Sequence, residues 1–138
     1  MEQANNNGTT PLFIASQEGH LVAAKCLVEE GNADVDKAMN RGCNPLYIAS
    51  KRGYLKVVKW LVEEGKADVD KAAYDGTTAL FGASGTGFLK AAKYLVEKGK
   101  AEVDKATGKG VTLLYIAEAD SNEEIVKYLK RKGAIEEN

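Results

Sequence analysis

The chain has 138 residues, of which 44% are hydrophobic and 28% charged, a composition typical of a folded globular domain and not of a disordered chain. Lys and Arg total 19 against 20 for Asp and Glu, so no global charge favours nucleic acid or a membrane as partner. The apolar runs are too short to cross a bilayer, and the first residues do not resemble a secretory signal. We therefore expect a cytoplasmic or nuclear protein with free thiols at Cys26 and Cys43.

The sequence repeats with a period of 34 residues. Similar phrases recur in register, namely GTTPLFIAS, GCNPLYIAS, GTTALFGAS and GVTLLYIAE, and they open at Gly8, Gly42, Gly76 and Gly110. A fixed period of this length indicates an array of similar structural units. We predict a single domain over residues 1–138, with repeats at about 1–34, 35–68, 69–102 and 103–138.

The first helix of each repeat is predicted to begin after a capping side chain. The oxygens of these side chains can accept hydrogen bonds from the free N–H groups of the first turn. The capping residues are Thr10, Asn44, Thr78 and Thr112. Pro11 and Pro45 follow at the first helical position, where a missing N–H has no cost. In the first three repeats a glycine marks the predicted end of this helix.

A second helix follows directly in every repeat, with the sequences HLVAAKCLVEE, YLKVVKWLVEE, FLKAAKYLVEK and NEEIVKYLKRK. In the second copy apolar residues recur at three- and four-residue spacing, which predicts one apolar face; they are Leu55, Val58, Leu61 and Val62. Such short helices are marginal alone, so each pair needs a neighbouring pair with a matching face. This need explains why the linking phrase returns as EEGNADVDKA, EEGKADVDKA and EKGKAEVDKA.

The third repeat departs from the others in its first helix. Gly82 stands where the other copies carry isoleucine, and Gly85 follows in the same short segment. Relative to alanine, two interior glycines should weaken the helix by about 2 kcal/mol, and a missing buried isoleucine side chain by on the order of 2 to 5 kcal/mol. We predict a soft spot here. It is either a small cleft for a partner side chain or a tolerated loss in a stable array.

The two ends of the array also differ. In the last copy Glu123 replaces a leucine and Lys130 replaces a valine, which predicts a polar cap. The first copy is as apolar as an internal one. Either that face is tolerated, or a longer array was cut, or two chains meet there. A monomer is expected, and an end-to-end dimer through the first repeat is left open.

These phrases resemble an ankyrin repeat. GTTPLFIASQEGHL followed by AAKCLVEEGNADVD is similar to the family pattern G-x-T-P-L-H-x-A, then G-H, then V-x-x-L-L, then G-A-D-V-N. The similarity covers essentially the whole chain. It implies an all-α solenoid of helix-turn-helix repeats, with loops that project at right angles. It also implies a folded protein partner, bound by the loop tips and the exposed side of each first helix.

Three departures from the family pattern recur in the copies. An aromatic residue replaces the usual histidine, one residue lengthens the loop, and aspartate replaces the usual final asparagine. The aromatic residues are Phe13, Tyr47, Phe81 and Tyr115, the added residues are Asn32, Lys66 and Lys100, and the aspartates are Asp36, Asp70 and Asp104. The aromatic residues suggest a larger apolar contact where the family often has an imidazole.

Carried onto this sequence, the resemblance places partner contacts at variable positions of the loops and first helices. The predicted contact residues are Asn40, Arg41, Cys43, Lys51, Arg52, Tyr74, Asp75, Thr77, Thr86 and Lys109. Tyr74 is predicted to be the centre, because an aromatic side chain among charged residues has the composition of a binding hot spot. The alternative is a tyrosine that lies flat on its own repeat.

No catalytic, metal or cofactor site is predicted. His20, the single histidine, occupies the G-H position that is structural in the family. Cys26 aligns with aromatic residues of the other copies, which predicts a small core residue and not a nucleophile. Two cysteines and one histidine lack zinc-ligand spacing. We predict a non-enzymatic module that binds a partner protein. The alternatives are a structural or engineered scaffold without a dedicated partner, and a fragment of a longer array attached to a regulatory protein.

Overall fold

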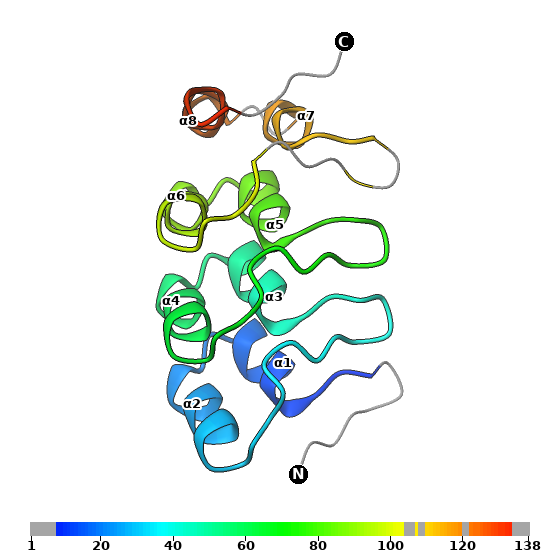
Figure 1. Ribbon diagram of the computed structural model, residues 1–138, viewed down its shortest axis with the longest axis vertical. Helices are drawn as coiled ribbons and strands as arrows, with labels where there is room; N and C mark the ends of the chain where they lie inside the picture. The colour runs from blue at the N-terminus through cyan, green and yellow to red at the C-terminus, as the bar shows by residue number, and fades with distance from the viewer. Residues whose placement is uncertain (1–7, 104–106, 108–109, 120–121, 134–138) are drawn as a thin grey trace.

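A computed structural model describes residues 8–103, 107, 110–119 and 122–133 of the chain. Its eight helices form four antiparallel pairs that follow one another along the long axis of the molecule (Figure 1). The helices are α1 (Pro11–Gln17), α2 (Leu21–Glu29), α3 (Pro45–Arg52), α4 (Leu55–Glu63), α5 (Ala79–Thr86), α6 (Leu89–Glu97), α7 (Leu113–Ala119) and α8 (Glu123–Arg131). Each pair lies within one predicted repeat, and the single domain with limits at 1 and 138 stays a prediction.

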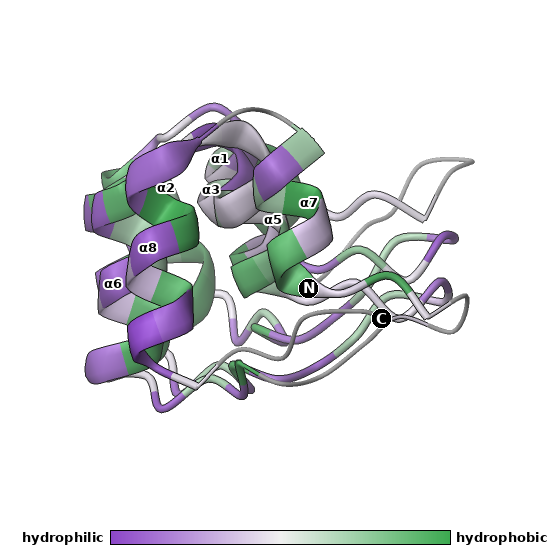
Figure 2. Cartoon of the chain, turned by 90° about the horizontal axis from the view of Figure 1, so that it is seen from above, coloured by the Kyte–Doolittle hydropathy of each residue, from purple (hydrophilic) through white to green (hydrophobic). Residues whose placement is uncertain are grey.

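The helices stand in two columns, and the long loops project from one side. Seen from above, α1, α3, α5 and α7 stand between the loops and the column that contains α2, α6 and α8 (Figure 2), and Figure 1 shows α4 in this same column. The predicted all-α solenoid with projecting loops is therefore confirmed. Among the described residues, no helix is long and apolar enough to span a membrane.

The predicted caps set the starts of the first-column helices. The side-chain oxygens of Thr10, Asn44 and Thr112 each accept a hydrogen bond from the amide three residues later, at 2.8 to 3.1 Å. Thr78 occupies the same position before α5 without a side-chain cap hydrogen bond. Gly53 ends α3 with a φ of 76°, a conformation that glycine adopts without steric cost. Local residues therefore fix where these helices begin and end.

The core runs along the axis of the stack between the two columns. Among its fully buried members are leucines that recur at the repeat period and are at most 1% exposed: Leu12, Leu46, Leu80 and Leu114 in the first column, and Leu61, Leu95 and Leu129 in the second. Burial of each such side chain stabilises the fold by about 1.5 to 3 kcal/mol. Because leucine occupies the same position in successive repeats, successive helix pairs pack against one another in the same way.

The repeated aspartates join successive loops. The Asp36 carboxylate accepts a hydrogen bond from the backbone N–H of Asp68, and Asp70 accepts one from Glu102, both at 3.0 Å. The Lys71 ammonium donates to the Asp36 carbonyl oxygen at 2.8 Å. Each of these hydrogen bonds therefore joins the linking segment of one repeat to the linking segment of the next. This contact is a physical reason for the phrase to return at a constant interval.

The residue that lengthens each loop adopts a left-handed conformation. Asn32, Lys66 and Lys100 have φ values of 55°, 58° and 59°. A side chain is disfavoured there because Cβ approaches the following carbonyl oxygen, at a cost of roughly 1 to 2 kcal/mol, with asparagine tolerated best. Each of these residues directly follows the glycine after a second-column helix, so the added residue completes the turn that leaves the helix.

The gap predicted where Gly82 replaces an isoleucine is not present, whereas the weakening of this helix by two glycines stays a prediction. A Cβ atom at Gly82 would lie 3.3 Å from Cβ of Lys51 and 3.4 Å from the Tyr47 ring. At Gly85 a Cβ atom would lie 2.8 Å from a methyl carbon of Ile116. Side chains of α3 and α7 therefore occupy the space beside α5. The two glycines allow this close approach.

The prediction that Cys26 is a small core residue is also wrong. Cys26 is exposed, whereas Trp60, Tyr94 and Tyr128 at the matching positions are at most 9% exposed. In α4, α6 and α8 this position packs toward the preceding helix pair. α2 is the first helix of its column among the described residues, so its cysteine has no such neighbour there.

Candidate binding surface

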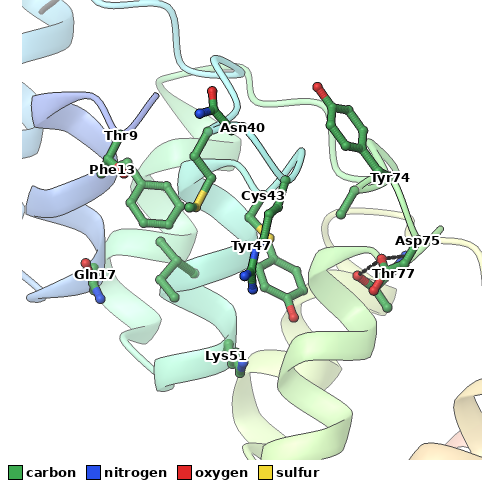
Figure 3. Close-up of a pocket in the computed structure, with 14 residues that line it drawn as sticks. Thr9, Phe13, Gln17, Asn40, Cys43, Tyr47, Lys51, Tyr74, Asp75 and Thr77 are labelled. Carbon is green, nitrogen blue, oxygen red and sulfur yellow. Dashed lines mark hydrogen bonds between the residues drawn. The ribbon is translucent and has the colours of Figure 1, made fainter. Parts of the chain in front are cut away.

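A groove runs along the angle between the projecting loops and the first-column helices (Figure 3). It has a volume of about 760 Å³ and crosses the first three repeats. Its residues come from α1, from α3 and from the segments that precede α1, α3 and α5. The periodic stacking of the repeats thus places side chains that are far apart in the sequence along one continuous surface.

The floor of the groove is apolar. Phe13 of α1 is 5% exposed and Ile48 of α3 is 9% exposed, and Met39 lies beside them. The half-buried Tyr47 ring continues this floor, and burial raises the pKa of its hydroxyl above the usual value. The floor of the groove therefore consists of aromatic and aliphatic side chains.

The loop before α5 forms one wall and is held by its own hydrogen bonds. Asp75 accepts from the backbone N–H of Thr77 at 3.0 Å and from its hydroxyl at 2.8 Å. The backbone amide of Ala73 donates to the carbonyl oxygen of Thr77 at 2.8 Å. The backbone amide of Tyr74 donates to the carbonyl oxygen of Arg41, on the neighbouring loop, at 3.3 Å. The wall is therefore held in one conformation by hydrogen bonds of the loop itself and to the neighbouring loop.

Tyr74 stands at the tip of this loop with its side chain 82% exposed. Its ring points away from the body of the protein (Figure 3) and does not lie flat on its own repeat. An aromatic ring can bury about 150 to 250 Å² in a contact, and tyrosine does so with little loss of side-chain entropy. Tyr74 thus offers more apolar area to a partner than its neighbours do.

Charged groups border the apolar floor. The Lys51 ammonium lies 5.9 Å from the centre of the Tyr47 ring, within the range of a cation–π contact, and Arg41 is exposed on the opposite loop. Burial raises the pKa of the Cys43 thiol and the Asp75 carboxylate adds to this effect, while Lys51 and Arg41 oppose it. Cys43 is therefore a neutral thiol near neutral pH and a poor nucleophile.

The groove brings together most of the residues predicted as partner contacts. Those that line it are Asn40, Arg41, Cys43, Lys51, Tyr74, Asp75 and Thr77. Arg52 is exposed on the last turn of α3 but does not line the groove. The Thr86 hydroxyl is hydrogen-bonded to the carbonyl oxygens of Lys51 and Gly82, so it joins α5 to α3. Lys109 lies outside the described residues.

The apolar floor was not among the predicted contacts. Phe13 and Tyr47 were assigned to the repeated frame, and Met39 lies in a loop stretch without a repeated pattern. A signal was present in the sequence, because aromatic residues replace the usual histidine at this position. That replacement predicted an added apolar contact, but not that the contact would face a groove.

The stacked helix pairs and the loop-bordered groove define the class of the protein, a helical repeat protein with projecting loops. A family model described as ankyrin repeats (3 copies) matches residues 1–73 and 65–137. The chain therefore belongs to the ankyrin repeat family, as its sequence predicted. A search of curated proteins found no match.

Ankyrin repeats are in general protein-interaction modules and are typically without enzymatic activity. Within the part of the chain that the structure describes, no group of three or more His, Cys, Asp or Glu side chains is placed to hold a metal ion. The groove combines an apolar floor, hydrogen-bonded polar groups and an exposed aromatic ring.

Proposed function

We propose that this chain is a non-enzymatic module that binds a partner protein in the groove, with Tyr74 as the central contact. The observation that carries the proposal is an 82% exposed aromatic ring on a hydrogen-bonded loop, beside a preformed apolar floor. Buried aromatic anchors supply most of the binding energy in many interfaces. A fixed loop and floor lose little entropy when such an anchor is covered.

The partner segment should carry an apolar side chain next to an acidic one. The apolar side chain would cover Phe13 and Tyr47, and the acidic one would pair with Lys51 or Arg41. Because Lys51 lies over the Tyr47 ring, a carboxylate there would be partly shielded from water, which strengthens its attraction to the ammonium. Asp75 is already hydrogen-bonded to Thr77 and disfavours a second carboxylate at the far wall.

The cellular setting is part of the same proposal. Both cysteines are free, which suits the reducing conditions of the cytoplasm or nucleus. The formal net charge is −1, so nucleic acid would gain little general electrostatic attraction. We therefore expect a protein partner in one of these compartments and no nucleic acid or membrane partner.

The test is selection of displayed peptides on the purified chain, followed by affinity measurements with the selected peptide. Tyr74→Ala should weaken binding by about 10- to 30-fold, and Lys51→Ala by about 3- to 10-fold. Arg52→Ala is the matched control, because Arg52 is the adjacent exposed cation outside the groove. It should change the affinity by less than about twofold.

Two results would count against the proposal. Equal losses for Arg52→Ala and Lys51→Ala would mean that the groove is not the site. Selection of no peptide on the wild-type chain, or of the same peptides on Tyr74→Ala, would favour a scaffold without a dedicated partner. Circular dichroism of each variant separates a binding loss from unfolding.

A further inference from the structure

Another hollow of the surface lies between α6 and α8, which are neighbours in the second column (Figure 1). It has a volume of about 590 Å³ and shares no residue with the groove described above. Leu89 of α6 and the ring of Tyr128 of α8 supply its apolar part. Its charged lining residues are the cations Lys93, Lys127, Lys130 and Arg131 and the carboxylate Glu124. We call this site the basic cleft, because its charges are mostly positive.

Three cations converge on the ring of Tyr128. The Lys93 and Lys132 ammonium groups lie 5.6 and 5.7 Å from the ring centre, and the guanidinium carbon of Arg131 lies 5.8 Å from it. All three are within the range of a cation–π contact. Tyr128 is 3% exposed and its hydroxyl donates to Glu97 at 2.6 Å, so the ring holds a fixed position. Like charges gathered around one ring repel one another, and an anion bound among them would lower that repulsion.

The same arrangement one repeat earlier is balanced in charge. The Tyr94 hydroxyl donates to Glu63 at 2.6 Å, and the Lys59 ammonium lies 5.8 Å from the ring centre. Within the described part of the chain, Lys59 is the one cation in range of that ring. One positive charge there accompanies one carboxylate, whereas three accompany the carboxylate that Tyr128 contacts. The additional cations are therefore not needed to hold such a tyrosine in place.

The sequence shows where this balance is lost. In α2, α4 and α6 a lysine is followed four residues later by a glutamate: Lys25 by Glu29, Lys59 by Glu63 and Lys93 by Glu97. Residues four apart lie on the same face of a helix, so each pair presents both charges together. In α8 the matching lysine, Lys127, is followed by Arg131. The helices α2, α4 and α6 also end without a basic residue in the last turn, so the fold does not require one at this place.

The ionisation of Glu97 agrees with an excess of positive charge at this end of the column. The pKa of its carboxyl lies below the usual range, first because of the hydrogen bond from Tyr128 and then because of nearby lysines. These lysines are Lys132, Lys93 and Lys98. The cations therefore stabilise one carboxylate already, and carboxylates of a ligand would be attracted in the same way.

The surroundings of the basic cleft limit the length of an anionic ligand. Glu63 and Glu64 lie exposed at the end of the neighbouring α4, and Glu123 lies exposed at the start of α8. A nucleic acid strand or a flat anionic membrane would bring further negative charges against these carboxylates. A short anionic segment reaches the cations without this repulsion. The half-buried Leu89 favours an apolar side chain next to the acidic ones, and a protein segment supplies both.

We propose that the basic cleft binds an acidic segment of a partner protein, with carboxylates at Lys127 and Arg131 and an apolar side chain against Leu89. The Tyr128 ring already restrains the cations around it, so less side-chain entropy is lost on binding. The cations are exposed and the attraction is mainly electrostatic, so the affinity should depend strongly on salt. This inference does not rest on the function proposed for the groove, because the two surfaces share no residue.

Fluorescence anisotropy of a labelled peptide tests the proposal with the full chain. The probe carries several glutamates around one leucine, and the control peptide has glutamines in their place. At low ionic strength the probe should bind about tenfold or more tightly than the control, and salt at roughly 0.2 M should weaken it by about tenfold. Lys127→Ala and Arg131→Ala should each weaken the binding by about 3- to 10-fold.

Lys59→Ala is the matched control for Lys93→Ala, because Lys59 has the same relation to Tyr94 outside the cleft. Lys93→Ala should weaken the binding by about 3- to 10-fold, and Lys59→Ala by less than about twofold. Tyr74→Ala should leave the affinity for the probe unchanged, which separates this site from the groove.

The NMR signals of the arginine side chains locate the contact. The probe should shift the signal of Arg131 and leave those of Arg41 and Arg52 in place, because neither of these lines the cleft. Circular dichroism checks that each variant folds. If Arg131→Ala loses its last helix pair, Lys127→Ala decides, since Lys127 is exposed and is not one of the three cations at the Tyr128 ring.

Three results would overturn the proposal. Equal affinity for the glutamate and glutamine peptides would show that the carboxylates are not recognised. Equal losses for Lys59→Ala and Lys93→Ala, or an unshifted Arg131 signal, would place the contact elsewhere. Tighter binding of a single-stranded oligonucleotide or of anionic lipid vesicles at the same salt would assign the cleft to nucleic acid or to a membrane.

Discussion

The first and second helix pairs have nearly the same sequence pattern but differ in burial. Leu27 of α2 is half-buried, whereas Leu61 at the matching position of α4 is 0% exposed. The reason is the number of neighbours: among the described residues α2 packs beside one pair, and α4 lies between two. In a stacked array, position in the stack therefore decides how much an identical residue stabilises the fold.

The cores of these two pairs differ in the same way. Leu12, Ala15 and Ala24 of the first pair form a small buried cluster of their own. A second and larger cluster continues from α3 to α8. Since fewer buried contacts hold the first pair, we expect it to open before the others.

The largest effect should come from truncating the shared leucine. Leu61→Ala removes a fully buried side chain between two neighbours and should lower the free energy of unfolding by about 3 kcal/mol. Leu27→Ala should lower it by about 1 kcal/mol, because the side chain is partly exposed already. Urea denaturation measures both values. Equal losses would show that the first pair is as tightly packed as the second.

Gly82→Ile extends the comparison to the third pair. The substitution installs the residue that α3 carries at this position, but here the space is occupied by Tyr47 and Lys51. We expect a loss of about 2 kcal/mol from crowding, measured by urea denaturation. In Gly82→Ala the gain in helix propensity, about 1 kcal/mol, offsets the milder crowding. An increase in stability with isoleucine would restore the view that α5 contains an unfilled gap.

Replacing the buried serine of the first pair or that of the second pair should change the free energy of unfolding by a similar amount. Ser16 and Ser50 are 0% exposed, and their hydroxyls have no hydrogen-bond partner within the described part of the chain. Replacement of either by alanine should raise the free energy of unfolding by about 1 kcal/mol, because an unpaired buried hydroxyl is removed. Thermal unfolding of the two variants checks this. A gain in only one pair would show that their first-column helices are packed differently.

The smallest expected effect concerns a hydrogen bond between neighbouring helix pairs that has no counterpart between the first and second pairs. Tyr128 donates to Glu97 at 2.6 Å and holds the pKa of that carboxyl below its usual range, whereas the matching residue of the second pair is Trp60. Because the folded-state pKa is lowered, the resulting stability is present above the unfolded-state pKa and is lost as the pH falls through the folded value.

Tyr128→Phe should therefore raise the pKa of Glu97 toward its usual value. An NMR titration of the side-chain carboxyl carbon measures this shift. Tyr94→Phe is the matched control, since its hydroxyl donates to Glu63 and should leave Glu97 unchanged. An unaltered Glu97 in Tyr128→Phe would assign its lowered pKa to the nearby lysines instead.

The groove, which is the proposed binding surface, was predictable only in part. Lys51 and Arg52 stand at adjacent variable positions of the repeat, so the family resemblance predicted both as contacts. Neighbouring helical residues point about 100° apart, and only Lys51 turns toward the groove. Phe13 and Tyr47 repeat like the frame, so their second role as the groove floor became visible only when the loops were placed above them.

The sequence by itself determined the period, the helix caps, the turns and the family. These features depend on residues close together in the chain, and Thr10 caps α1 through an amide only three residues away. Tertiary structure decided what each repeated residue faces. It exposed Cys26 and buried Trp60, and it filled the space at Gly82 from α3. The burial of a residue depends on whether another helix pair packs against it. The sequence of a single repeat does not show which neighbours that repeat has.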